Sequence, residues 1–243
     1  MRLSALAFAA AVAVTCAPAA DARKAAARTG QTGQDAPAAP AALAASVTWK
    51  IDNLKKIGGN PVTVIGNPQV IKGPRGKAVQ FDGANDGLLV GVNPVAGARA
   101  FTVEAVIRPD AGGLEEQRWI HIQGPTADSR VMLETRLYGG VWFLDTFVKN
   151  GPRPEDGRTL FNESFRHAAG VWYHVALVYD GEVARNYVNG QPELSGPLAV
   201  GPLEAGQMSI GVRQNRVFWF KGAISRLRFT PRALAPGEFM PKD

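Results

Sequence analysis

Residues 171–190, with the sequence VWYHVALVYDGEVARNYVNG, decide the fold. Two runs of aromatic and β-branched residues, which favour strands, flank a polar break at Asp180-Gly181-Glu182, and a second break follows at Asn189-Gly190. Asp-Gly and Asn-Gly readily adopt the positive φ angles that hairpin turns require. Both faces of the first strand are largely apolar, so we expect it to lie inside a β-sandwich and not at a wet edge.

The remainder of the sequence shows the same alternation of strand-forming runs and turn residues. About a dozen short runs of strand-forming residues are separated by clusters of Gly, Pro, Asn and Asp. In residues 101–108 apolar and polar side chains largely alternate, which is the period of a strand. No window of ten or more residues shows helical periodicity. The pattern therefore predicts an all-β fold, a two-sheet antiparallel β-sandwich or jelly roll.

Three segments carry a resemblance to a known family. WYHVALVYDG (172–181) followed by YVNG (187–190), GKAVQFDG (76–83), and GAIS (222–225) with the tail RAL (232–234) resemble laminin-G-like domains of the concanavalin A-like lectin/glucanase superfamily. The resemblance covers roughly Ser46 to Phe239. It implies a concanavalin A-like sandwich whose first and last strands pair, whereas function depends on the site, because one fold hosts many sites.

The first 22 residues are typical of a secretory signal peptide. Arg2 is followed by an apolar run, 3–14, and by a small-x-small cleavage site at Ala20-Asp21-Ala22. That run is too short for a membrane span. We therefore expect a secreted or periplasmic protein. A lipoprotein acylated at Cys16 is the less favoured alternative, because Ala13-Val14-Thr15 is a poor lipobox.

The chain after the signal divides into two parts. Residues 23–45 are rich in Ala and Pro, have no periodic apolar face and are predicted to be a flexible linker. Residues 46–243 are long enough for one domain with a sizeable core. Cys16 is the only cysteine, so the cleaved chain would hold no disulfide, thiolate metal site or cysteine nucleophile.

The chain has a formal net charge of +6 but no run of basic residues. Nucleic-acid binding requires a clustered basic patch, so we expect no nucleic-acid partner. A mild positive excess is compatible with anionic glycans. The sequence does not decide the oligomeric state.

A loop rich in oxygen ligands follows the run 78–81. Asp82, Asn85 and Asp86 place three oxygen-bearing side chains within five residues, and calcium prefers such ligands. The family resemblance also implies a calcium ion near this loop, but the acidic residue that usually follows Gly-x-Ile in the closing strand is here Ser225. The alternative is a turn that uses Asp and Asn to cap its own backbone.

Polar side chains recur at alternate positions of the middle strands, where they are unfavourable to bury and suited to a groove. We expect a glycan-binding groove, with Trp142 or Asp145 facing Glu134 according to the register, and with a second polar segment at 213–221 closing its end. The expected ligand-binding residues are Gln123, Arg130, Glu134, Arg136, Trp142, Asp145, Arg213, Asn215 and Trp219. The alternatives are a solvated sheet face with weak Glu–Arg pairs and, for the second segment, a core role for its phenylalanines with Trp219 at the rim.

Three classes of function remain open. The favoured hypothesis is a secreted carbohydrate-binding, lectin-like module without catalysis. The first alternative is a polysaccharide lyase or glycoside hydrolase that uses His121, Glu134 and Arg136, although no motif places two carboxylates on one strand. The second alternative is a protein-interaction or structural module. His174 is expected to be a buried structural histidine.

Overall fold

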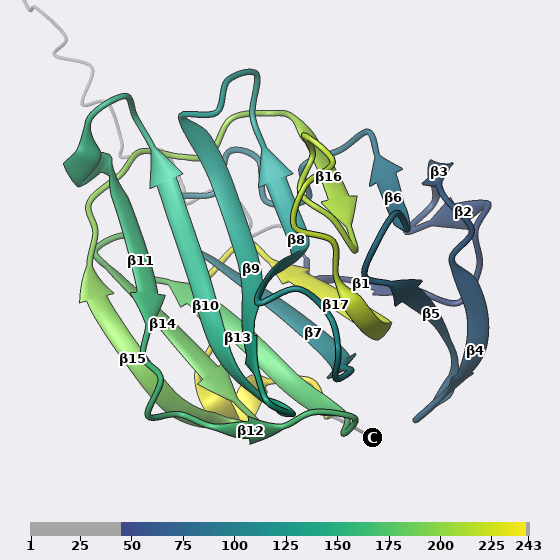
Figure 1. The fold of residues 1–243 in the computed structure, drawn as a ribbon. Helices are drawn as coiled ribbons and strands as arrows, with labels where there is room; N and C mark the ends of the chain where they lie inside the picture. Colours follow the sequence, from purple (N-terminus) through teal and green to yellow (C-terminus); the bar gives the residue numbers. More distant parts are fainter. Residues whose placement is uncertain (1–44, 242–243) are drawn as a thin grey trace, which may run out of the picture. The chain divides into compact units, whose positions relative to one another are not determined.

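The computed structural model describes residues 45–241, which form two antiparallel β-sheets packed face to face (Figure 1). The predicted signal segment 1–22, Cys16, and the predicted linker up to residue 44 lie outside the described residues. Among the residues that are described, no helix is long and apolar enough to cross a membrane.

The larger sheet has nine strands and the smaller sheet has eight. The larger sheet contains β2 (Lys56–Ile57), β3 (Asn60–Ile65), β6 (Gly87–Val90), β8 (Glu116–Gln123), β9 (Ser129–Tyr138), β10 (Val141–Asn150), β11 (Gly157–Phe161), β12 (His167–Ala168) and β16 (Gln207–Ile210). The smaller sheet contains β1 (Val47–Lys50), β4 (Gln69–Gly73), β5 (Gly76–Asp82), β7 (Phe101–Pro109), β13 (Tyr173–Tyr179), β14 (Val183–Val188), β15 (Gln191–Pro197) and β17 (Lys221–Thr230). Two short 3-10 helices, η1 (Pro154–Asp156) and η2 (Pro236–Glu238), complete the described elements.

The predicted hairpin is formed by β13 and β14. Gly181 has a φ of 104° and Asn189 a φ of 50°, as the two turns require. One face of β13 packs into the core between the sheets, and the other packs with Tyr187 against Phe239 of the C-terminal segment. Both faces of this strand are therefore buried, as its sequence predicts.

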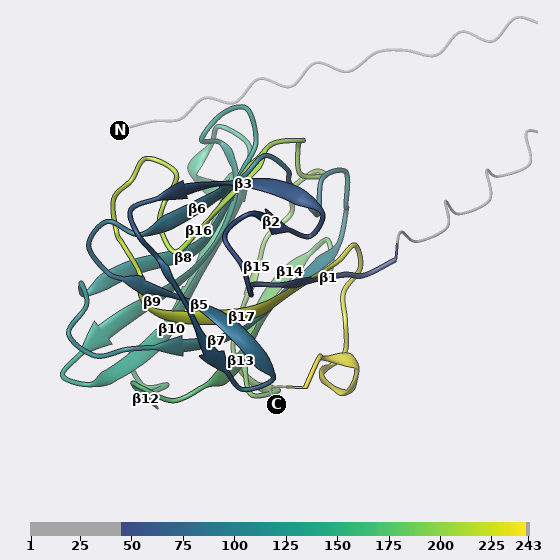
Figure 2. The same ribbon diagram turned by 90° about the vertical axis from the view of Figure 1, so that its right-hand side faces the viewer.

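The first and last strands pair, as the family resemblance implies. Trp49 of β1 lies opposite Leu227 of β17, and its ring packs at 4.9 Å from that of Phe229. Figure 2 shows β1 beside β17 at the N-terminal end of the described chain. The prediction of an all-β antiparallel sandwich is confirmed.

β15 contains Pro192 but is an edge strand, where this proline removes no hydrogen bond of the sheet interior. Residues 217–220 form a loop before β17.

The direction of the side chains in β9 and β10 positions the site. Val131 and Leu133 of β9 and Leu144 and Val148 of β10 belong to the core between the sheets. Since side chains alternate along a strand, the even-numbered residues of β9 and the odd-numbered residues of β10 lie on the outer face of the larger sheet.

Candidate functional site

Two carboxylates lie side by side at the centre of this outer face. Glu134 of β9 is the cross-strand partner of Asp145 of β10, and they are 2% and 1% exposed. Arg118 Nε lies 2.6 Å from Glu134 Oε2, and Arg136 Nη2 lies 2.8 Å from Asp145 Oδ2. Both arginines also bind Glu116, so two guanidinium groups tie three carboxylates into one network.

The environment of this pair raises the pKa values of both acids. Burial raises the pKa of Glu134 to about 8, and the neighbouring Asp145 charge adds to that effect, against the opposing charges of Arg118 and Arg136. Burial also raises the pKa of Asp145, although Arg136 opposes it. We therefore infer that the pair retains a proton at neutral pH, since two adjacent buried carboxylates do not both ionise readily.

His121 of β8 lies on the same face and is held in one tautomer. The backbone N–H of Gln214 donates to His121 Nδ1 at 3.1 Å, so a neutral His121 carries its proton on Nε2. Burial lowers the pKa of His121 to about 3, and the charges of Arg213, Arg130 and Arg118 add to this effect. The imidazole is 1% exposed and neutral at physiological pH.

The loop between β16 and β17 reaches over this part of the sheet. Phe218 has a φ of 59°, its carbonyl oxygen accepts the N–H of Arg118 at 2.9 Å, and its ring lies 3.8 Å from the Arg118 guanidinium carbon. A positive φ at phenylalanine is strained and persists only when its surroundings fix it. The loop therefore covers the arginine that neutralises Glu134. Asn215 is exposed on this loop and Trp219 is half-buried.

Aromatic side chains gather on the outer face where β9 turns into β10. The rings of Tyr138 and Phe161 lie 5.9 Å and 6.3 Å from the ring of Phe143, which is buried between them. Tyr138 and Phe161 are 46% and 37% exposed. A pocket of about 550 Å³ opens here, lined by Tyr138, Gly139, Val141, Phe143, Glu163 and Arg166. We call Tyr138, Phe143 and Phe161 the aromatic platform.

The structure brings most of the expected groove residues to one face. Arg130 lies across from Gln123, and Asp145 is the cross-strand partner of Glu134. Trp142, in contrast, is fully buried in the core, where its ring packs 4.7 Å from His167 and 5.1 Å from Tyr173. Its parity on β10 is that of Leu144, so Trp142 does not line the outer face.

The aromatic platform was not predicted from the sequence. Phenylalanine is usually buried, and nothing in the local sequence distinguishes Phe143 or Phe161 from a core residue. One signal was available: Phe143 has the parity of Asp145 along β10, which places both on the same face.

The Asp82–Asp86 loop forms a self-capped turn. Asp82 Oδ1 accepts the N–H groups of Ala84, Asn85 and Asp86 at 2.8 to 3.1 Å. Burial acts to raise the pKa of Asp82, but these backbone donors outweigh it and lower the pKa. Both Asp86 oxygens also accept backbone N–H groups. Carboxylates turned toward N–H donors fit the turn interpretation better than a cation cage, and calcium binding here stays a prediction.

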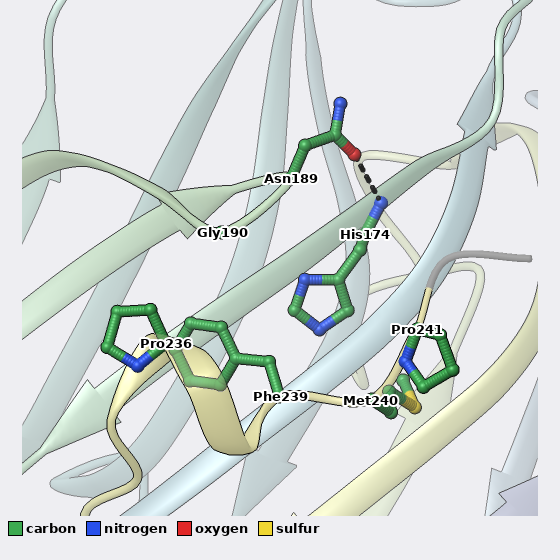
Figure 3. A pocket seen from close by; sticks show the side chains of 7 residues that line it. All are labelled: His174, Asn189, Gly190, Pro236, Phe239, Met240 and Pro241. Atoms are coloured by element: carbon green, nitrogen blue, oxygen red, sulfur yellow. Dashed lines mark hydrogen bonds between the residues drawn. The ribbon is translucent and has the colours of Figure 1, made fainter.

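A separate hollow of about 350 Å³ lies on the outer face of the smaller sheet, beneath the C-terminal segment (Figure 3). His174, as expected, is buried there: its Nε2 lies 3.0 Å from Glu104 Oε1, and the Phe239 ring packs 5.4 Å from its own. Glu104 also binds Arg228 and accepts the N–H of Met240. These contacts attach the C-terminal segment to the sheet.

Comparison with solved structures shows the fold in several settings. Domain 4 of AbnA, a GH43 extracellular arabinanase from Geobacillus stearothermophilus, solved with arabinotriose, has a TM-score of 0.58 and 20% identity over 79% of this chain and 94% of its own. The CBM40 of the Ruminococcus gnavus IT-sialidase has a TM-score of 0.51 and 16% identity over 66% and 93%. The binding domain of botulinum neurotoxin DC, solved with SialylT, has a TM-score of 0.57 and 11% identity over 79% of this chain and 49% of its own. At these identities the likeness shows the fold alone.

The sequence gives a family assignment. Among curated proteins, no sequence matches the chain significantly. The laminin-G family model described as the concanavalin A-like lectin/glucanases superfamily matches residues 82–239, which include the predicted hairpin, the carboxylate network and the aromatic platform. The chain belongs to the concanavalin A-like lectin/glucanase superfamily.

Proposed function

We propose that this protein is a carbohydrate-binding module that holds a glycan against the outer face of its larger sheet. The observation that carries the proposal is the aromatic platform, in which exposed Tyr138 and Phe161 flank Phe143 beside a pocket of about 550 Å³. Exposed aromatic rings beside a hollow mark a binding surface, because they present large apolar faces to a ligand.

The surroundings of the platform suit a sugar. Aromatic faces pack on the apolar faces of sugar rings, and charged groups at the edge bind the hydroxyls. Glu163 and Arg166 line the pocket, and the Arg136 guanidinium carbon lies 5.3 Å from the centre of the Phe161 ring. The platform thus combines apolar surface with donors and acceptors at its rim.

Ligands of the structural neighbours support the same class of function. One neighbour was solved with arabinotriose and another with SialylT. These ligands belong to those proteins, and we carry over to this chain only the proposal that its partner is a glycan.

We further propose that binding occurs without catalysis. The paired carboxylates and the raised pKa of Glu134 are the features that favour a glycoside hydrolase. However, Glu134 and Asp145 are buried, and each is ion-paired with an arginine of the network. His121 is equally buried and its Nδ1 is occupied, which removes it from a base role in a lyase. A substrate would have to displace Arg118 or Arg136 before it reached Glu134 or Asp145.

An exported location is part of the same proposal. It rests on the sequence of residues 1–22 and is tested by fractionating cells that express the full chain and determining the N-terminus of the product. A product beginning at Arg23 outside the cytoplasm is the expected result. An uncleaved chain retained in the cytoplasm would contradict it.

Affinity electrophoresis against a panel of neutral polysaccharides tests the binding function. We expect retardation by at least one polymer, without release of reducing ends or of products absorbing near 235 nm. Phe161→Ala should weaken that binding about tenfold, or ~1.4 kcal/mol, as expected for an aromatic anchor. Val70→Ala, at an exposed position of the smaller sheet, is the matched control. Equal binding by the two variants would refute the platform as the site.

A further inference from the structure

Three N–H donors on the outer face of the larger sheet are buried without an acceptor. They are His121 Nε2, Arg130 Nε and Arg213 Nε. Because His121 Nδ1 accepts the N–H of Gln214, the neutral imidazole must present Nε2 as a donor. Buried donors that lack a partner are rare and unfavourable, so three within one cluster call for an explanation.

The three residues lie together. Arg130 is the partner of Gln123 on β8, two positions from His121, and Arg213 precedes the residue whose N–H binds the His121 ring. The charges of Arg213 and Arg130 both act on His121, and that of Arg213 acts on Arg130. The fold thus places two guanidinium groups close enough to repel each other.

No carboxylate within the described residues forms an ion pair with either arginine. The two acids whose charges reach Arg130 are Asp128 and Glu134. Asp128 lies 2.9 Å from Lys149 Nζ, and Glu134 is bound by Arg118. The Arg130 guanidinium instead packs 5.0 Å from the centre of the Phe147 ring. The cluster therefore holds two positive charges that are not compensated by a bound acid.

Gln123, the cross-strand partner of Arg130, lines a further hollow. A pocket of about 400 Å³ is lined by Gly91, Gln123, Gly124, Pro125, Ala205, Gly206 and Gln207. Gln123 and Gln207 are cross-strand partners in β8 and β16, and Gln123 is also the partner of Arg130. A ligand in this hollow would contact Gln123, the strand neighbour of Arg130.

We infer that His121, Arg130 and Arg213 form a subsite for an anionic group of a glycan, a carboxylate or a sulfate ester. Either group supplies the negative charge and the acceptor oxygens that two guanidinium groups and an imidazole N–H lack. The inference rests on the proposed function in that the anion is carried by a glycan. Arg130 and Tyr138 are eight residues apart on β9, or ~26 Å at ~3.3 Å per residue, so this subsite is distinct from the aromatic platform.

Affinity electrophoresis with three polymers tests the subsite: polygalacturonate for carboxylates, dextran sulfate for sulfate esters, and unmodified dextran as the neutral polymer. The full chain should be retarded by one acidic polymer. Arg130→Gln and Arg213→Gln should each weaken that retardation about tenfold, as for loss of a charge-assisted hydrogen bond, with unchanged circular dichroism. Arg216→Gln, on the same loop and exposed, makes the same change in net charge and should leave it unaltered.

The outcomes separate the two proposals. An equal loss in Arg216→Gln would mean that net charge alone attracts the polymer and would overturn the subsite. Retardation by neutral polymers only would also overturn it, while leaving the aromatic platform in place.

A second measurement does not depend on retardation by any polymer. The same proteins are titrated with sodium galacturonate and sodium sulfate by NMR. A shift of the Gln214 amide that Arg213→Gln abolishes would support the subsite even without retardation, and no shift would refute it.

Discussion

Glu134 and Asp145 face each other across the β9–β10 pair, and each is neutralised by a different arginine, Arg118 and Arg136. Burial of the two adjacent acids raises both of their pKa values, that of Glu134 to about 8. A cross-strand pair of this kind is stable only while it shares a proton or retains both arginines.

The first prediction concerns the loss of stability as the pH rises through neutrality. The folded-state pKa of Glu134 lies above its usual value of 4.5, so the folded protein binds more protons than the unfolded chain between about pH 4.5 and 8. The stability that this group contributes is present below that window and is lost as the pH rises through it, by up to about 1.4 kcal/mol per pH unit. Urea unfolding at pH 5 to 9 measures the loss.

Glu134→Gln is the matched variant for this prediction, because glutamine keeps the shape and cannot ionise. It should unfold with a flatter dependence on pH than the natural protein, with the difference concentrated between pH 5 and 8. Parallel pH profiles for the two proteins would show that Glu134 does not hold the proton.

The second prediction concerns the acid side. The folded-state pKa of His121, about 3, lies below its usual value of 6.5, so the unfolded chain binds more protons in that window. The contribution of His121 to stability is therefore present above pH 6.5 and is lost as the pH falls toward 3. Unfolding of His121→Gln, followed over pH 3 to 7, should lack this component. If the two proteins lose stability in step, His121 titrates normally in the fold.

The sequence allowed the sandwich to be predicted because its signals are local. Asp180-Gly181 and Asn189-Gly190 set two turns, and the apolar residues of β13 set its burial on both faces. Such signals require no knowledge of distant partners.

The site was less accessible to sequence reasoning because it depends on register. The β8–β9 pairing shifts between Arg118 and Ile120, so Arg118 and His121 reach the same face although they are three residues apart. Alternation along the strand would have assigned them to opposite faces. Residues 211–220 cover Arg118, and this arrangement likewise depends on the positive φ of Phe218. No turn motif in the sequence predicts that φ.

The third prediction concerns the C-terminal segment. Phe239 packs on His174, as Figure 3 shows. It also packs on Tyr187, over the outer face of β13. Phe239→Ala removes this half-buried ring and should lower the free energy of unfolding by about 2 kcal/mol, somewhat less than for a fully buried phenylalanine. Urea denaturation gives the value, with exposed Val64→Ala as the control that should stay within ~0.5 kcal/mol. A smaller loss than in the control would mean that the segment does not seal this face.

The last prediction separates the two aromatic side chains that sequence reasoning and structure assign differently. Trp142 is fully buried in the core, whereas Phe161 is 37% exposed on the outer face. Trp142→Ala should therefore cost about 3–5 kcal/mol of stability, because it opens a large cavity between the sheets. Phe161→Ala should leave the unfolding midpoint almost unchanged and weaken glycan retention about tenfold. Thermal unfolding gives the midpoint of each variant, and affinity electrophoresis gives its affinity for the glycan. If Trp142→Ala folds with natural stability and loses glycan binding, the register of β10 and the position of the platform are both incorrect.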